Sequence, residues 1–468
     1  MRPGRWALAS LSLAMLLPSL GTSIANAALP TLAQTFHASF QTVQWVVLSY
    51  LLASTTLIVS VGRLADLMGK RRLLLVGIGM FSLASGMCGV AHRLWLMIAA
   101  RAAQGMGAAL MLTLTLALVG EIVPKSQTGR AMGLLGTMSA IGTALGPSLG
   151  GVLIHGLGWR SIFFVNIPLG LVTLVLAHRH LPADRRMPKE GPPKLDYLGT
   201  LLLALTLGAF ALAMTIGGRG SFGALNVGLL LGACGALISF VLAEGRAGSP
   251  LIRLSLFRDG ALSASLAMSA LVSTVMMATL VVGPFYLSRG LGLEPLAVGL
   301  VLSAGPLVAA LSGVPAGRLA DHFGAQRTTV AGLVGLLAGC FVMFMMPLTR
   351  GIPGYVAPIA LITVGYALFQ TANNAAVLAD VAAEQRGLVS GLLNLSRNLG
   401  LISGASLMGA VFAVASATSE ITSARPEAVV AGMQVTFLVA AGLVVAALAI
   451  VLARRFRDPR GLVSSDMA

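Results

Sequence analysis

The stretch Gly62-Arg63-Leu64-Ala65-Asp66-Leu67-Met68-Gly69-Lys70-Arg71-Arg72 is a charged segment between two long apolar runs. A second copy, from Gly317 to Arg327, repeats the order of glycine, basic residue, Leu-Ala-Asp, glycine and basic residue, again between two apolar runs. It begins 255 residues after the first. A repeat of this length does not arise readily by chance. It predicts two homologous halves, each with a charged hinge.

Composition places the chain in a membrane. Of its 468 residues, 57% are hydrophobic and 10% are charged, far from the balance of a soluble domain. The formal net charge of +16 is compatible with a nucleic-acid partner, but the basic residues lie in short connections instead of on one soluble face. Cys88, Cys234 and Cys340 stand in apolar runs without paired spacing, which indicates core residues. We expect a polytopic membrane protein that binds no nucleic acid and no metal.

An apolar run needs about twenty residues to cross about 30 Å of hydrocarbon as a helix. Fourteen such runs are predicted, over residues 6–29, 43–62, 72–91, 95–119, 130–154, 161–178, 197–217, 222–243, 261–287, 295–316, 327–348, 354–379, 387–416 and 431–453. The segment from Met1 to Ala27 imitates a signal peptide, but we expect it to remain as the first span because many equally apolar spans follow. The predicted fold class is an all-α polytopic membrane protein.

Lysine and arginine fall mainly on every second connection between spans. Because short cytoplasmic loops are enriched in these residues, both termini are expected in the cytoplasm. The two hinges follow spans 2 and 10, so spans 7 and 8 are read as an insertion between two six-helix halves. The expected domains are residues 1–180 (first half), 181–258 (cytoplasmic linker and two inserted helices), 259–453 (second half) and 454–468 (cytoplasmic tail).

Two arginines, Arg101 and Arg397, fall within spans, where an ionisable side chain is costly and faces a cavity or a partner. Gln104 lies on nearly the same helix face as Arg101, and Asn394 precedes Arg397 by one turn. A second polar group consists of Gln370, Asn373 and Asn374 in span 12. These residues, with the aromatic residues Trp45 and Tyr50 of span 2, are candidates for contact with a transported compound. Alternatively, the two arginines only donate hydrogen bonds to backbone carbonyls of an opposing helix.

Span 5 carries Gly142, Gly146 and Gly150 at four-residue intervals, which predicts a smooth stripe against which another helix packs closely. Pro147 in the same span predicts a bend, because it leaves one carbonyl without its helical partner. In the hinge, Gly62 and Gly69 are expected to form a tight turn, and Asp66 to accept hydrogen bonds from the amides of a neighbouring helix N-terminus.

These segments resemble the major facilitator superfamily, and within it the fourteen-span drug:proton antiporters of the EmrB/QacA type. The resemblance rests on five segments in the expected order: the hinge, Leu96 to Ala109, Gly142 to Gly151, Trp159 to Gly170, and Gly391 to Gly400. It implies alternating access, in which two halves rock about a central site and a cytoplasmic latch breaks and reforms. The implied gating residues are Gly62, Asp66, Gly69, Arg71, Gly317, Asp321, Gly324 and Arg327. It also implies that the bend at Pro147 shapes the export cavity.

The chain departs from this family in its first span. The family carries an acidic residue before a run that here is Ser23-Ile-Ala-Asn26-Ala-Ala-Leu-Pro30, and the acidic position is Gly21. Asn26 of this run remains a candidate substrate or coupling residue. The acidic residues all fall in loops, in tails or at span edges. A proton gradient could act through edge carboxylates such as Glu121 or Asp380, or through an ionisable substrate; transport could also be uncoupled.

We therefore expect a secondary transporter of the bacterial inner membrane that exports small amphipathic compounds, needs no cofactor and uses the proton gradient. It is not expected to be an enzyme, because the sequence contains no phosphate-binding loop and no nucleophile motif. A monomer is favoured. Two alternatives remain: an importer or uncoupled facilitator of a sugar or organic anion, and a membrane sensor that has lost transport.

Overall fold

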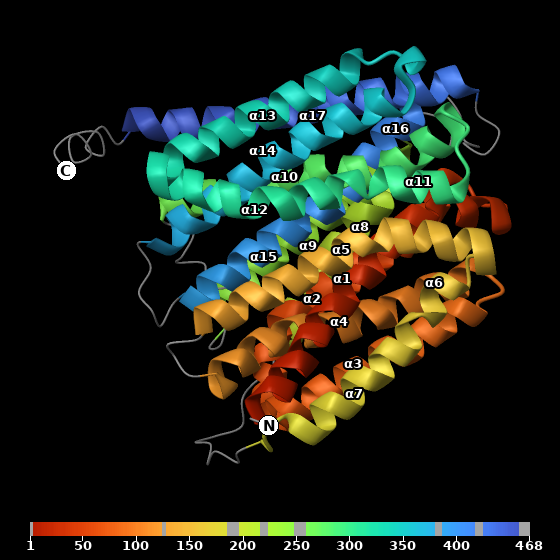
Figure 1. Cartoon of the computed structure of the whole chain (residues 1–468). Helices are drawn as coiled ribbons and strands as arrows, with labels where there is room; N and C mark the ends of the chain where they lie inside the picture. The colour runs from red at the N-terminus through yellow and green to blue at the C-terminus, as the bar shows by residue number, and fades with distance from the viewer. Residues whose placement is uncertain are drawn as a thin grey trace.

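The computed structural model describes residues 3–123, 128–184, 196–215, 223–247, 259–379, 386–416 and 425–457, and every regular element within them is a helix (Figure 1). The first half contains α1 (Pro3–Thr35), α2 (Phe40–Met68), α3 (Lys70–Val90), α4 (Leu94–Ile122), α5 (Thr128–Leu157), α6 (Ser161–Phe164) and α7 (Asn166–His180). Two further helices, α8 (Tyr197–Thr215) and α9 (Ala224–Arg246), fall within the predicted insertion. The second half contains α10 (Gly260–Phe285), η3 (Tyr286–Gly290), α11 (Pro295–Leu302), α12 (Ala304–Phe323), α13 (Ala325–Met345), η4 (Leu348–Arg350), α14 (Gly351–Ala379), α15 (Arg386–Ser403), η5 (Gly404–Met408), α16 (Gly409–Ala415) and α17 (Pro426–Arg457).

Thirteen helices of the described residues are long and apolar enough to cross a membrane. They match thirteen of the fourteen predicted spans. The remaining prediction, residues 43–62, coincides with α2, which is helical over 29 residues but is not one of the thirteen. Fourteen membrane crossings therefore stay a prediction, while the all-helical fold is observed.

The two halves repeat one packing pattern. In the first half, α1 packs against α5 and α7, and α4 packs against α2 and α3. In the second half, α10 packs against α15 and α17, and α14 packs against α12 and α13. Figure 1 places the first half, coloured red to yellow, below the second half, coloured teal to blue. The internal sequence repeat therefore corresponds to repeated helix packing.

The glycine stripe of α5 lies against α1. A Cβ atom built on Gly146 would lie 2.6 Å from Ser23 Cβ and 2.7 Å from the backbone nitrogen of Ile24. A Cβ atom on Gly142 would lie 2.6 Å from the carbonyl oxygen of Leu16. All three distances are well below ordinary van der Waals contact, so only glycine lets the two backbones approach this closely. Ser23 also donates a hydrogen bond to the Gly142 carbonyl across the contact.

The inserted helix α8 is attached to α2 at two levels. Trp45 Nε1 donates to Thr215 Oγ1 (3.0 Å) near one end of α8. Near the other end, the hydroxyl groups of Ser60 and Thr200 lie 2.9 Å apart. Helix α8 also touches α15, η5 and α16 of the second half. The insertion therefore lies along the first half and borders the second.

The halves also meet at the ends of the helices that we expect to face outward, where the connections are poor in basic residues. The ring of Phe40 packs against Phe285 and Phe412, with centroids 4.7 and 5.2 Å apart. A Cβ atom on Gly299 of α11 would lie 2.9 Å from the Cα of Gly151 of α5. These aromatic and glycine contacts bring the outer ends of the two halves together in this state.

Candidate functional site

The buried guanidinium of Arg101 is the centre of a polar network in the first half. Its side chain has no exposed surface. Nε donates to the carbonyl oxygen of Val46 on α2 (2.8 Å), and Nη1 donates to the carbonyl oxygen of Gly21 on α1 (3.2 Å) and to Oε1 of Gln104 (2.6 Å). The ring of Tyr50 lies 4.4 Å from the guanidinium carbon, a cation–π contact. Arg101 thus ties together α1, α2 and α4.

Gln104 extends this network to α3. Its Nε2 donates to Ser85 Oγ (2.6 Å), and the Ser85 hydroxyl donates to the Phe81 carbonyl (2.7 Å). The predicted pairing of Arg101 with Gln104 on one helix face is observed. The backbone acceptors of Arg101 also match the alternative reading, in which it serves only to link helices. Its transport role stays a prediction.

The two aromatic candidates of α2 have structural partners. Tyr50 donates its hydroxyl to the Pro18 carbonyl on α1 (3.1 Å) and supports Arg101 with its ring. Trp45 is half-buried and holds α8 through Thr215. Both side chains therefore link α2 to a neighbouring helix in this state.

The second half has its own polar cluster, which is looser. Gln370 donates to Asn374 (3.3 Å), whereas Asn373 turns toward α10 and donates to the Ser265 carbonyl (3.3 Å). Arg397 is half-buried, and its Nε has no hydrogen-bond partner. The side chain of Asn394 lies outside those that the structure describes. Gln370 and Asn374 therefore contact each other, whereas Asn373 contacts α10.

Two buried amides, one on α1 and one on α2, have no hydrogen-bond partner. Asn26 is 3% exposed, and neither its nitrogen nor its oxygen has a hydrogen-bond partner. Gln44 is 1% exposed and is equally unpartnered. A Cβ atom built on Gly409 of the second half would lie 2.7 Å from Gln44 Cδ. Sequence reasoning missed Gln44 because it stands at the edge of a span, where a polar residue carries no signal.

The hinge differs from its prediction in one respect. Gly69 forms the turn between α2 and α3 with φ of 90°, and Gly324 forms the matching turn between α12 and α13 with φ of 83°. Gly62 lies inside α2, which continues as far as Met68, so its predicted part in the turn was wrong. Leu64, Ala65, Leu67 and Met68 all favour a helix, so α2 continues beyond the predicted span. Gly317 likewise lies within α12.

The carboxylate of Asp184, near the C-terminal end of the first half, stabilises the turn at Gly69. Asp184, just beyond α7, accepts hydrogen bonds from the backbone amides of Arg71 (2.8 Å) and Arg72 (3.1 Å) at the start of α3. The guanidinium of Arg71 also donates to the carbonyl of His178. Helix N-termini favour such anionic caps. The side chain of Asp66, the predicted latch, lies outside those that the structure describes, whereas Asp321 and Arg327 are exposed.

Two carboxylates, Glu121 and Asp380, are candidates for proton coupling. The side chain of Glu121 and the whole of Asp380 lie outside the described residues. Within the described part of the chain, no group of three His, Cys, Asp or Glu side chains is placed to hold a metal ion.

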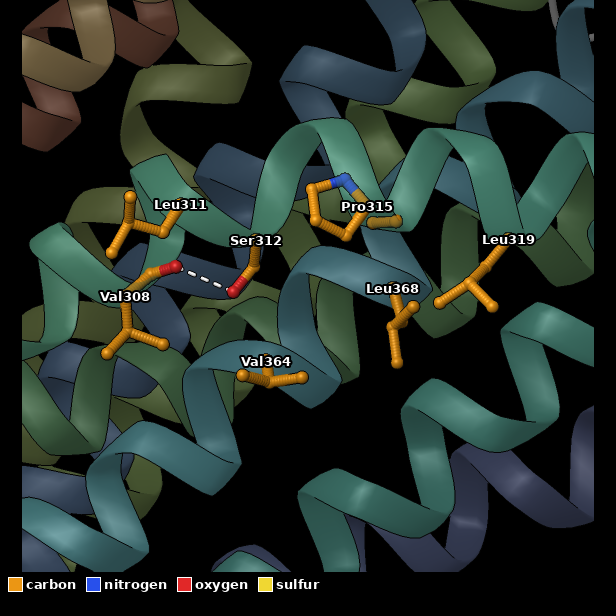
Figure 2. A pocket seen from close by; sticks show the side chains of 8 residues that line it. Val308, Leu311, Ser312, Pro315, Leu319, Val364 and Leu368 are labelled. Carbon is orange, nitrogen blue, oxygen red and sulfur yellow. Dashed lines mark hydrogen bonds between the residues drawn. The ribbon is translucent and has the colours of Figure 1, made fainter.

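An apolar pocket of about 220 Å³ lies between α12 and α14 (Figure 2). It is lined by Val308, Leu311, Ser312, Pro315, Ala316, Leu319, Val364 and Leu368. Its volume is below the roughly 300–1,000 Å³ of sites for drug-sized ligands. On α14, Leu368 and Gln370 point about 200° apart, because successive residues turn by about 100°. The pocket therefore does not adjoin the amide cluster.

Comparison with known proteins agrees with this architecture. The chain is 32% identical over 396 residues to the multidrug resistance protein Stp of Mycobacterium tuberculosis, covering 84% of this chain and 73% of Stp. It is 30% identical over 399 residues to the riboflavin transporter RibZ of Clostridioides difficile, covering 84% and 85%.

Among solved structures, it resembles a bacterial homolog of the human lysosomal transporter Spinster in an inward-facing, unoccupied conformation. The TM-score is 0.68 at 16% identity, over 97% of this chain and 98% of that one. A model of the Major Facilitator Superfamily matches residues 11–405. Together with the paired helix packing and the repeated hinge, this match establishes that the chain is a transporter of the Major Facilitator Superfamily.

Proposed function

We propose that this transporter exports small amphipathic compounds of the multidrug type by alternating access. The observation that carries the proposal is the network at Arg101, a buried polar site joining α1, α2 and α4. The name of Stp supports export of this kind. Contacts of Phe40, Gly151 and Gly409 between the outer ends of the halves support a state that is closed outward. In the proposed cycle these contacts open when the halves rock and the inner ends approach each other.

We further propose that the chain belongs to the fourteen-span branch, with α2 as the additional crossing, and lies in the bacterial inner membrane with both termini in the cytoplasm. The attachment of α8 to α2 supports an insertion that moves with the first half. The six-helix halves at 1–180 and 259–453 are the two moving bodies of this proposal. We propose that proton coupling runs through an edge carboxylate such as Glu121 or Asp380, because none of the acidic residues falls within a predicted span.

A second candidate is a metabolite facilitator, which the name of RibZ favours. Purified protein reconstituted in vesicles with an imposed pH gradient separates the two. Movement of protons together with substrate supports antiport, whereas substrate flux that ignores the gradient supports facilitation. Absence of flux for every compound in a screen of ionic and neutral molecules would contradict both and favour a sensor.

Arg101→Ala tests the residue assignment within the same assay. We expect transport to fall to background while the variant still inserts into the membrane, because the guanidinium contacts three helices. Arg101→Lys, which keeps the charge but lacks the planar fork, is the matched control and should retain partial flux. Near-normal flux in Arg101→Ala would assign Arg101 to helix linkage alone.

A further inference from the structure

Arg101 is a buried cation whose observed partners are all uncharged. Its three hydrogen-bond acceptors are two backbone carbonyls and one side-chain amide. Its second terminal nitrogen, Nη2, is buried and has no acceptor. Because an arginine side chain stays protonated at any ordinary pH, the site holds a net positive charge within the bundle. A charge in this position is costly unless an opposite charge and further hydrogen bonds compensate it.

Among the residues that the structure describes, the groups around Arg101 provide no such compensation. The titratable side chains that act electrostatically on Arg101 are the phenol of Tyr50 and the thiol of Cys88. Both groups are neutral near pH 7. Gly21 approaches through its carbonyl and has no side chain. A Cβ atom built there would lie 3.0 Å from Phe81 Cζ and 3.7 Å from Gln104 Nε2. A side chain at position 21 would therefore point into the network that holds Arg101.

We propose that the missing negative charge comes from the transported compound, so that the substrates are amphipathic organic anions. A carboxylate or sulfonate group accepts hydrogen bonds from Nη2 of Arg101, and the apolar body of the compound packs against aromatic side chains such as Tyr50 and Phe81. Charge-assisted bonds to a guanidinium are shorter and stronger than bonds between neutral groups, which gives the anion its advantage over a neutral analogue. This inference rests on the export function proposed above and specifies its substrate class.

Arg101 has no exposed surface in the present state, so an anion reaches it only when the helices around it move. Binding is therefore linked to the rocking of the halves. Because the site is positive, it also disfavours cationic compounds by direct repulsion.

A matched set of three probes tests the proposal by binding to the purified full-length protein. The probes share a pyrenebutyl body and carry a carboxylate, an uncharged carboxamide or a trimethylammonium head. We expect the carboxylate to bind at least about tenfold more tightly than the carboxamide, as hydrogen bonds to a charged group imply, and the trimethylammonium probe to bind least. In Arg101→Gln the preference for the carboxylate should fall to within about twofold. Arg101→Lys should keep part of the preference, since the charge remains.

A second pair of variants adds a negative charge beside Arg101. Gly21→Asp and Gly21→Asn place nearly identical side chains against Phe81 and Gln104, so their ratio isolates the added charge from the added bulk. Relative to Gly21→Asn, Gly21→Asp should weaken binding of the carboxylate probe by about tenfold and strengthen binding of the trimethylammonium probe.

Equal affinity of the wild-type protein for the carboxylate and the carboxamide would overturn the proposal, and this comparison needs no variant to fold. Tighter binding of the trimethylammonium probe would overturn it as well. If none of the three probes binds while the vesicle screen detects transport of other compounds, the anion assignment is wrong and the export function stands. Absence of any transport in that screen would instead remove the export function itself.

Discussion

Replacing Gly146 with alanine tests a close helix contact in the first half, between α5 and α1. The added Cβ would lie 2.6 Å from Ser23 Cβ and 2.7 Å from the backbone nitrogen of Ile24. Ordinary contacts between such atoms are about 3.5–4.0 Å, so α1 and α5 must separate by roughly 1 Å. The backbone of α1 cannot turn aside as a side chain could. The separation therefore spreads along the whole contact between the two helices.

Overpacking of this kind costs about 1–3 kcal/mol. The measurement is thermal unfolding of the purified protein in detergent, followed by tryptophan fluorescence or by loss of the monodisperse peak. We expect the midpoint for Gly146→Ala to fall by about 1–3 °C, because the entropy of unfolding of a chain of this length is large. The matched control is Gly136→Ala on the same helix, where a Cβ would meet no atom within 4 Å. That variant should be neutral or slightly stabilising, because alanine favours a helix by up to about 1 kcal/mol over glycine.

Equal unfolding midpoints for Gly146→Ala and Gly136→Ala would contradict the close approach of α1 to α5 at Gly146. Such a result would mean that α1 and α5 are farther apart than described, or that the first half adjusts without loss. A fall in transport without a fall in stability would instead assign the stripe to the moving parts of the cycle.

Two other substitutions probe the hinge and the outer contact. Asp184→Asn should weaken the cap of α3 by about 1 kcal/mol. Hydrogen–deuterium exchange should then show faster amide exchange at the first residues of α3. The control is Asp196→Asn, which alters a similar cap on α8 and should leave amide exchange in α3 unchanged. Gly409→Ala should displace Gln44 and favour the outward-open state. A cysteine placed at Phe40 should then be labelled faster by a thiol reagent. An unchanged labelling rate would contradict the proposed role of this contact.

The helices and their order could be predicted from the sequence because hydrophobic length and the placement of basic residues are local signals. The positions of Gly69 and Gly324 in the turns also follow from local chemistry, since both adopt positive φ. The inclusion of Gly62 in the turn failed because a charged segment was read as a loop. In the structure, the helix continues through Arg63 and Asp66 to its end at Met68, because the leucine, alanine and methionine residues between and after them favour a helix.

The partners of the functional candidates could not be predicted, because they depend on tertiary contacts. Arg101 bonds to carbonyls of Val46 and Gly21, and any residue type presents a carbonyl. Asp184 reaches the start of α3 from a position more than a hundred residues later in the chain. No sequence pattern marks either contact, whereas the pairing of Arg101 with Gln104 follows from helical spacing alone.

Rocking of the two halves is tested by two distances, one between their outer ends and one between their inner ends. Spin labels at Leu157 and Glu294 report the outer ends of α5 and α11, and labels at Leu134 and Phe323 report the inner ends of α5 and α12; all four side chains are exposed. Cys234, which is exposed, is first replaced by serine.

Pulsed electron paramagnetic resonance in lipid then gives both distance distributions with and without a transported compound and a pH gradient. If the two halves rock, the outer distance lengthens while the inner distance shortens, each by several ångströms. Distances that stay fixed under every condition, or that change in the same direction, would contradict alternating access in this protein.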